Sequence, residues 1–398
     1  MKKRFSVPSV ILLILLFSLL TFQLTYTFTG NLYQKKVDLL TESGTEYPVL
    51  SEADALIRKN FVGTIDDDTL ETAMIRGYLS ALPDRYSRYL TAEEYRAYKA
   101  EKEGKGSGIG VRVLYDTGAQ EVVLFSVFPN SPAAKAGLMR GDVLYKIDGS
   151  PVSELGYEGT VDAIAGDAGT KVKLVILREV AAQTVQIEAE VERGEVQIAS
   201  LDFEMLPEKV GYIRVYTFDE NTAAAFEEAV QSLMKDGAKA LIFDLRDNGG
   251  GRMDAACKML DVLLSEGCLI RTTDRDGNVA EQKATPGGVD LPMALLVNGG
   301  SASASEIFAG ALKDHKKAVL VGETTYGKGT AQAVLELKDG SALILSNLYF
   351  SPPFSDCPEG AGIEPDIPVK NGADTSYFIN RTKDEQLRAA LKAVAVPE

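Results

Sequence analysis

Lys328 stands in a glycine-rich loop, 322-GETTYGKGT-330, that matches most of the phosphate-binding pattern G-x-x-x-x-G-K-[ST]. Such a loop needs a hydroxyl directly after its lysine and a helix that begins there. Here Gly329 follows the lysine, and the next residues alternate as strands do. The sequence therefore argues against nucleotide binding. Glycines on both sides of a lysine instead allow close packing that keeps its ammonium out of water, which lowers the pKa and predicts a general base.

A general base acts on a nucleophile, and 301-SASASE-306 offers serines at the start of a helix predicted over 303–314. One interpretation is structural, because Ser303 and Glu306 form the S-x-x-E pattern of a capping box. The other is chemical, because backbone amides at a helix N-terminus can stabilise an oxyanion. The motif alone leaves both interpretations open.

The chain contains a single histidine, His315, which decides what serine chemistry is open to it. It lies twelve residues beyond Ser303 on the same predicted helix, about 18 Å along the axis, and therefore cannot reach the Ser303 hydroxyl. We expect His315 to face solvent, and a catalytic serine here needs a lysine as its base. The turn 244-DLRDNGGGR-252 follows an apolar strand and could expose further amides for an oxyanion.

Strands and helices alternate from residue 211 onward, which is typical of an α/β domain with at least partly parallel strands. The predicted strands span 211–218, 240–246, 293–299 and 318–322. The predicted helices span 221–237, 253–264, 303–314 and, near the C-terminus, 382–395. A hairpin is predicted over 333–350, with its turn at Asp339-Gly340.

Two other regions precede this domain. Apolar residues at helical spacing predict helices over 50–61, 68–82 and 91–103. Residues 106–193 instead predict a small module of mostly strands with glycine turns between them. Its predicted strands span 109–115, 121–128, 142–149 and 171–178, and short helices are predicted at 131–138 and 157–165.

Bulk properties limit the location and the partners of the chain. A net charge of −15 disfavours binding to nucleic acid, so we expect no such partner. Lys2, Lys3 and Arg4 precede an apolar run long enough to span a membrane, with the N-terminus in the cytoplasm and the remainder outside. A cleaved secretory signal is the alternative, and both place the domains outside the cytoplasm. Three scattered cysteines predict free or buried thiols, with a Cys257–Cys268 pair left open.

These segments together resemble the carboxyl-terminal processing peptidases, membrane-associated or secreted serine–lysine peptidases also called tail-specific proteases. The matching segments are 244-DLRDNGGG-251, 298-NGGSASASEIFAGAL-312, 320-LVGETTYGKGTAQ-332, 362-GIEPDIPV-369 and the PDZ-like 106-GSGIGV-111 with 129-PNSPAAKAGLMRGDVLYKIDG-149. The resemblance covers about residues 48 to 396. It implies an α/β fold within an α+β multidomain chain, with an inserted PDZ-like domain and a β-hairpin extension on the peptidase core.

Position by position, the resemblance implies a nucleophile at Ser303, a general base at Lys328 and an orienting glutamine at Gln332. The oxyanion donors fall on the amides of Ala304 and of one glycine among 249–251, of which we favour Gly251. In the PDZ-like module, the loop that cradles a substrate carboxylate falls on Gly108, Ile109, Gly110 and Val111.

The resemblance implies five regions: a transmembrane signal anchor (1–30), a linker (31–47), an N-terminal helical region (48–103), a PDZ-like domain (104–193) and a serine peptidase core with a C-terminal helix (194–398). It implies protein or peptide substrates with exposed C-termini, a membrane contact through the N-terminal helix, and neither metal nor other cofactor. A homo-oligomer and an activating partner protein are left open. The alternative function is a catalytically silent PDZ scaffold that binds protein C-termini at the cell surface.

Overall fold

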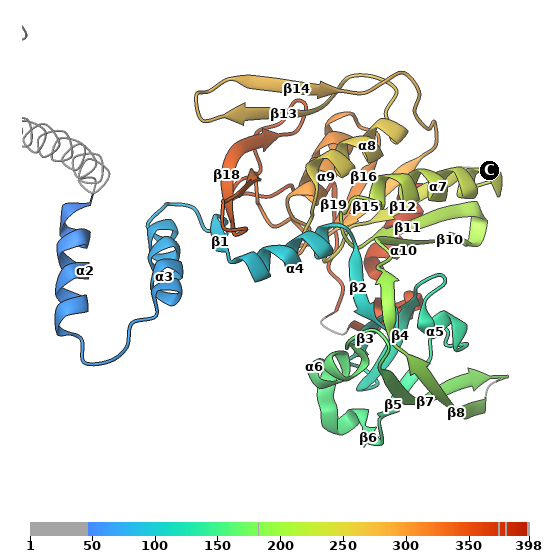
Figure 1. Ribbon diagram of the computed structural model, residues 1–398. Helices are drawn as coiled ribbons and strands as arrows, with labels where there is room; N and C mark the ends of the chain where they lie inside the picture. Colours follow the sequence, from blue (N-terminus) through green and yellow to red (C-terminus); the bar gives the residue numbers. More distant parts are fainter. Residues whose placement is uncertain (1–46, 182, 373–374, 379, 396–398) are drawn as a thin grey trace, which may run out of the picture. The chain divides into compact units, whose positions relative to one another are not determined.

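The computed structural model describes residues 47–395, apart from 182, 373–374 and 379 (Figure 1). The predicted signal anchor and the linker up to residue 46 lie outside the described residues. Among the helices that are described, none is long and apolar enough to cross a membrane. The described residues divide into two units, one that ends at Met74 and one that begins at Ile75.

The three helices predicted before residue 104 are confirmed. They are α2 (Pro48–Asn60), α3 (Asp67–Ser80) and α4 (Ala92–Lys102). Within the first unit, the Arg58 side chain pairs with Asp54 one turn earlier and with Asp67 at the start of α3. Both pairs are exposed, so they contribute little to stability.

A six-stranded sheet forms the centre of the second unit and confirms the predicted α/β core. Its strands, in spatial order, are β10 (Leu201–Leu206), β11 (Val210–Val215), β12 (Ala240–Asp244), β15 (Met293–Val297), β16 (Val319–Gly322) and β19 (Ile367–Pro368). All neighbours are parallel except β10 and β11. The carboxyl ends of β12, β15 and β16 therefore meet at one edge.

Helices cover both faces of this sheet, as the apolar runs of its strands require (Figure 1). One face packs against α7 (Thr222–Lys235), α8 (Met253–Leu263) and α9 (Ala304–Asp314), and the other against α10 (Glu385–Ala393). Phe308 of α9 packs edge-on against Phe243 of β12 and Phe226 of α7, with ring centroids 5.8 Å and 6.0 Å apart. Burying one such side chain stabilises by about 1.5–3 kcal/mol, which anchors the helix that begins after Ser303.

A second, antiparallel sheet carries the predicted hairpin, with β17 (Thr330–Glu336) and β18 (Ala342–Ser351) on either side of Asp339-Gly340. Three strands missing from the sequence prediction join it: β1 (Arg88–Leu90), β13 (Cys268–Asp274) and β14 (Val279–Lys283). Since β1 pairs with β18, the segment just before α4 lies against this second sheet.

The strand-rich module is confirmed as a separate sheet of β3 (Val111–Asp116), β4 (Glu121–Val127), β5 (Val143–Ile147), β7 (Lys171–Val180) and β8 (Gln183–Glu192), with β6 (Ser150–Pro151) at the edge of β5. Its helices are α5 (Pro132–Lys135) and α6 (Val152–Ile164). Where the chain enters and leaves the module, β2 (Lys105–Gly108) pairs with β9 (Gly194–Gln197). The sequence prediction had missed β2, β8, β9 and β10.

Candidate active site

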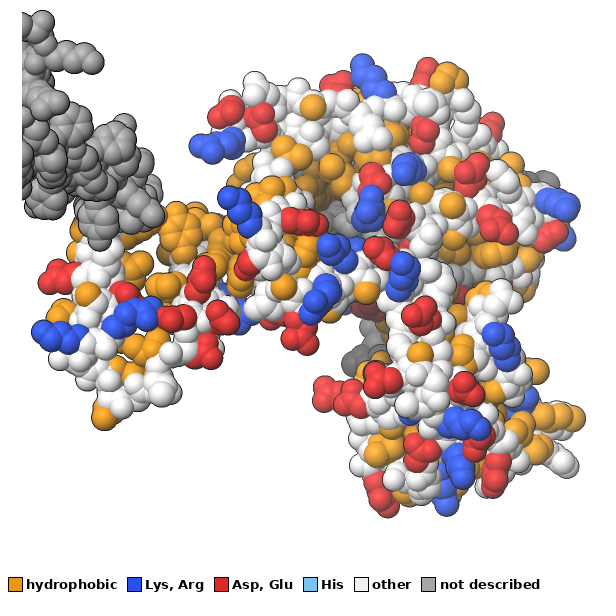
Figure 2. Space-filling view, in the orientation of Figure 1, with side chains coloured by type: hydrophobic (Ala, Val, Ile, Leu, Met, Phe, Trp, Pro, Cys, Tyr) orange, Lys and Arg blue, Asp and Glu red, His pale blue; other side chains and the backbone are white. Residues whose placement is uncertain are grey.

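Three loops that follow β12, β15 and β16 meet at the carboxyl edge of the parallel sheet, where α/β proteins generally bind ligands. They border a cavity of about 750 Å³ that Ser303, Lys328, Gln332 and Gly251 all line. Strand β1 and helix α4 contribute to the same cavity. Lys and Arg side chains gather on the face where Figure 1 places α4, as Figure 2 shows.

Ser303 holds an unusual backbone conformation at the N-cap of α9, with φ 56° and ψ −112°. Left-handed φ values strain a residue with a side chain, and such strain concentrates at functional sites. The neighbouring hydroxyls are committed to backbone carbonyls: Ser301 donates to Leu245, and Ser305 donates to Asn248, both at 2.8 Å. Both neighbours are buried, whereas Ser303 is half-buried and lines the cavity.

The glycine turn after β12 packs directly against this serine. A Cβ at Gly250 would lie 2.5 Å from the Ala302 carbonyl oxygen and 2.9 Å from the Ala304 amide, so only glycine fits there. The Gly250 amide is already used, because it donates to Asn248 Oδ1 at 2.8 Å. The amides of Gly251 and Ala304, by contrast, have no acceptor among the described residues. These two amides are therefore available to a ligand in the cavity.

Lys328 reaches the cavity from the loop after β16. Its Nζ donates to Gln332 Oε1 at 2.8 Å and lies 4.7 Å from the centre of the Tyr86 ring. Gln332 is itself held, since its Nε2 donates to Ser346 Oγ at 3.2 Å beside a β-bulge in β17. In the described part of the chain no hydrogen bond joins Lys328 to Ser303. The structure thus places Ser303 and Lys328 in one cavity without a hydrogen bond between them. Catalytic hydrogen bonds are often long in enzymes that hold no ligand.

Glu306 has a larger role than the capping pattern indicated. It is fully buried, and its Oε2 accepts from the Ser303 amide at 2.8 Å, as the capping box predicts. The same carboxyl group accepts from the amides of Gly327 and Lys328 and from the Thr325 hydroxyl at 2.7–2.9 Å. Burial raises its pKa, although these hydrogen bonds oppose that effect. Glu306 therefore ties the serine backbone to the lysine loop.

The surroundings of Lys328 favour its neutral form. Burial lowers the pKa of its ammonium below the ordinary value, and the positive charges of Lys102 and Arg88 lower it further. The carboxylates of Asp84 and Glu359 act in the opposite direction, without reversing the net shift. A lysine with a lowered pKa can accept a proton nearer to neutral pH.

Lys102→Met should therefore move the pH profile of any hydrolysis in which Lys328 acts as the base. Activity that needs neutral Lys328 rises as pH increases through the pKa of this group. Removing the Lys102 charge raises that pKa, so the acid limb of kcat/KM should shift to higher pH. The matched control is Lys99→Met on the same helix, because Lys99 is paired with Glu336. An unchanged acid limb in Lys102→Met would contradict this electrostatic assignment.

A second groove lies in the strand-rich module. The predicted loop residues Gly108, Ile109, Gly110 and Val111 all line it, together with Tyr157, Val161 and Ile164 of α6. Its volume is about 320 Å³. The groove between a strand and a helix fits an extended peptide that adds to the edge of β3.

His315 is further from solvent than expected. It is half-buried at the end of α9, with Nε2 2.7 Å from the Cys268 carbonyl oxygen and its ring against Phe354. The expectation of a solvent-facing histidine was wrong, because the loop after β18 and the start of β13 close over this helix end. Helix α9 still separates His315 from Ser303.

The three cysteines, Cys257, Cys268 and Cys357, are all free. The disulfide between Cys257 and Cys268 that the sequence left open therefore does not form.

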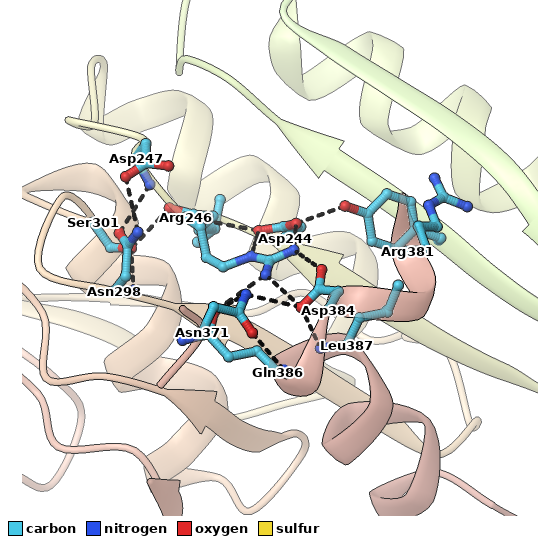
Figure 3. A network of polar contacts seen from close by, with 12 residues as sticks. Asp244, Arg246, Asp247, Asn298, Ser301, Asn371, Arg381, Asp384, Gln386 and Leu387 are labelled. Carbon is cyan, nitrogen blue, oxygen red and sulfur yellow. Dashed lines mark hydrogen bonds and ion pairs between the residues drawn. The ribbon is translucent and has the colours of Figure 1, made fainter. Parts of the chain in front are cut away.

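A buried ionic network lies behind the glycine turn (Figure 3). Arg246 donates to Asp244 at the end of β12 and to Asp384 just before α10, with N···O distances of 2.9 Å and 3.0 Å. Tyr212 donates to Asp244, and Asn371 donates to Asp384. Asn298 and Asp247 exchange hydrogen bonds on the side nearer to the serine loop. The network joins the C-terminal segment to the turn that presents Gly251.

Comparisons with known proteins identify the family of the chain. The family model for peptidase family S41 matches residues 209–369, and a PDZ domain model matches residues 126–178. A "Probable CtpA-like serine protease" of Staphylococcus haemolyticus is 30% identical over 92% of this chain and 73% of its own length. The chloroplastic C-terminal processing peptidase of Tetradesmus obliquus is 33% identical over 74% of this chain and 66% of its own length.

The fold has a counterpart among solved structures. A crystal structure of a protein from Bacteroides fragilis, provisionally assigned as an S41 protease, covers 85% of this chain and 95% of its own with a TM-score of 0.58. At 19% identity this likeness shows the fold alone. The family follows from the sequence relatives and from the matched domains. The chain belongs to peptidase family S41, among the C-terminal processing peptidases, and is a serine-type peptidase.

Proposed function

We propose that the chain is an extracytoplasmic endopeptidase that cleaves near the C-termini of protein substrates through a Ser303–Lys328 dyad. The observation that carries this proposal is the strained Ser303, which lines the same cavity as Lys328, while the Gly251 and Ala304 amides have no acceptor among the residues that the structure describes. Neutral Lys328 donates one N–H to Gln332 Oε1, which leaves its nitrogen lone pair to accept the serine proton.

The reaction proceeds in two stages. Ser303 Oγ attacks the scissile carbonyl carbon while its proton passes to Lys328 Nζ, and the Gly251 and Ala304 amides stabilise the oxyanion. The C–N bond then breaks, and the protonated lysine returns the proton to the leaving amine. Water, deprotonated by Lys328, hydrolyses the acyl-enzyme in the same way. The positive end of α9 adds to the oxyanion stabilisation.

Substrate capture is assigned to the groove of Gly108–Val111, which would hold the C-terminus as an added strand. We place the catalytic unit outside the cytoplasm, tethered to the membrane by the apolar N-terminal segment. A homo-oligomer and an activating partner protein are compatible with this proposal and are not required by it.

An unstructured reporter protein tests the proposed function. A reporter with an apolar C-terminus should be cleaved severalfold faster than the same reporter ending in charged residues. Deleting the side chains that enclose the groove, as in Tyr157→Ala, should reduce this difference and leave hydrolysis of short peptides largely intact. Binding of the apolar C-terminus without cleavage at any pH would instead favour the silent PDZ scaffold.

A further inference from the structure

The active-site cavity carries an excess of positive charge, although the chain as a whole has a net charge of −15. Its acidic lining residues are Glu103 and Glu220. Its basic lining residues are Arg85, Arg88, Lys99, Lys102, Arg252 and Lys328. A cavity of this composition attracts anionic groups over neutral ones.

Several of these basic groups are already engaged. Lys99 pairs with Glu336 at 3.4 Å, and Arg252 pairs with Asp254 at 3.0 Å. Arg85 donates to the Tyr86 hydroxyl at 2.6 Å. Lys328 is held by Gln332, as described above. Lys99 and Arg252 thus have carboxylate partners within the protein, whereas Arg85 and Lys328 are hydrogen-bonded to neutral side chains.

Arg88 and Lys102 differ from this group. Within the described residues neither forms an ion pair or a hydrogen bond to a carboxylate, and the acidic Glu103 is paired with Lys105 instead. They come from different elements, β1 and α4, and both lie against the ring of Tyr98, at 5.7 Å and 5.3 Å from its centre. Both cations thus lie within about 6 Å of one ring centre, and neither is paired with a carboxylate in the described part of the chain, so both can pair with an anionic ligand.

We propose that Arg88 and Lys102 bind a carboxylate of the peptide substrate inside the active-site cavity, so that the peptidase prefers acidic sequences around the scissile bond. This inference rests on the proposed function. Two sources share the required chemistry: an Asp or Glu side chain near the scissile bond, and the terminal carboxylate of a short substrate. The charges of Arg88 and Lys102 also lower the pKa of Lys328, which agrees with their position near the proposed general base.

Variants of one parent peptide distinguish the two possible sources of the carboxylate. One series moves a single Glu through the positions that flank the scissile bond, and each peptide is compared with its Gln counterpart. A second series compares a free with an amidated C-terminus. Each series is measured on the wild-type protein, on Arg88→Gln and Lys102→Gln, and on Lys99→Gln, whose charge lines the same cavity but is paired with Glu336.

At one or two positions, Glu should raise kcat/KM over Gln by about fivefold, the effect of roughly one exposed ion pair. The preference should shrink in Arg88→Gln and in Lys102→Gln, persist in Lys99→Gln, and fall as salt rises. If the terminal carboxylate is the ligand, amidation should cost activity in the wild type but not in these two variants. A loss on amidation that persists in them would assign the terminal carboxylate to the other groove.

The inference is overturned if no Glu position is preferred and amidation has the same effect in the wild type and both variants. It is also overturned if Lys99→Gln removes the preference as fully as Arg88→Gln does. Failure of the proposed function has a different signature, because the wild type would then cleave neither the Glu nor the Gln peptides. Binding of the same peptides to Ser303→Ala, followed by fluorescence anisotropy, gives a readout of the preference that does not depend on turnover.

Discussion

Ser303→Ala and Lys328→Ala should each lower peptide hydrolysis by about 10⁴-fold or more while the protein stays folded, because each removes one half of the proposed nucleophile–base pair. The double variant should be hardly slower than either single variant, since residues that act as one unit are not additive. Initial rates on an unstructured protein substrate measure the loss, and thermal unfolding checks the fold.

An active-site probe separates the two roles. A fluorophosphonate should label the wild type at Ser303, fail on Ser303→Ala, and label Lys328→Ala only slowly, because the serine persists without its base. Ser305→Ala is the matched control, since that hydroxyl donates to the Asn248 carbonyl and not into the cavity. His315→Ala should cost little activity. Full turnover in purified Ser303→Ala or Lys328→Ala would refute the dyad, and a large loss in His315→Ala would refute the exclusion of histidine.

Much of the core was predictable because local patterns specify it. Strands buried on both faces appear as apolar runs, and their alternation with amphipathic helices predicts a parallel sheet. The loops that carry Ser303 and Lys328 follow neighbouring strands β15 and β16, so their meeting at one edge follows from the topology. The glycines on both sides of Lys328 also have the expected cause, since a Cβ at Gly329 would lie 2.4 Å from Cys357 Sγ.

The second sheet and the supports of the site were less predictable. Strand β1 has three residues and gains its stability only from pairing with β18, over 250 residues away in the sequence. Tyr86 therefore could not be linked to Lys328 from local pattern. Glu306 could be predicted as a cap because that signal is local, whereas its bonds to Thr325 and Gly327 depend on tertiary contacts.

Arg246→Met should destabilise the protein by about 3–5 kcal/mol, the usual cost of removing one partner from a buried ion pair. The reason is that Asp244 and Asp384, both nearly inaccessible to solvent, would lose the guanidinium that lies between them (Figure 3). Arg246→Lys should rescue little, because an ammonium cannot form the paired hydrogen bonds that the guanidinium makes to both carboxylates. Thermal unfolding should show a lower Tm by about 10 °C.

Acidic pH should lower the free energy of unfolding of the wild-type protein through the same network. Burial alone would raise the pKa of Asp244, but Arg246, together with Arg214 and Tyr212, outweighs it and lowers that pKa to about 2. A carboxyl group with a lowered pKa stabilises the fold above its unfolded pKa of about 3.8, and this contribution, about 2 kcal/mol, is lost as pH falls from there toward 2. Arg246→Met should lack this acid-sensitive component of stability.

The C-terminal segment should prove essential to catalysis for the same reason. Asp384→Asn keeps the size of the side chain, but it removes one charge and replaces an oxygen that accepts from Arg246 with an NH2 group. It should therefore unfold less readily than Arg246→Met yet loosen the turn that presents Gly251. Its kcat should fall more than its KM rises, because the oxyanion contact is made in the transition state. Arg388→Met is the control on α10, since its pair with Glu385 is exposed and contributes at most about 1 kcal/mol. If Arg246→Met and Arg388→Met unfold at the same temperature, the buried network does not stabilise the fold, and an unchanged kcat in Asp384→Asn would show that the network does not position Gly251.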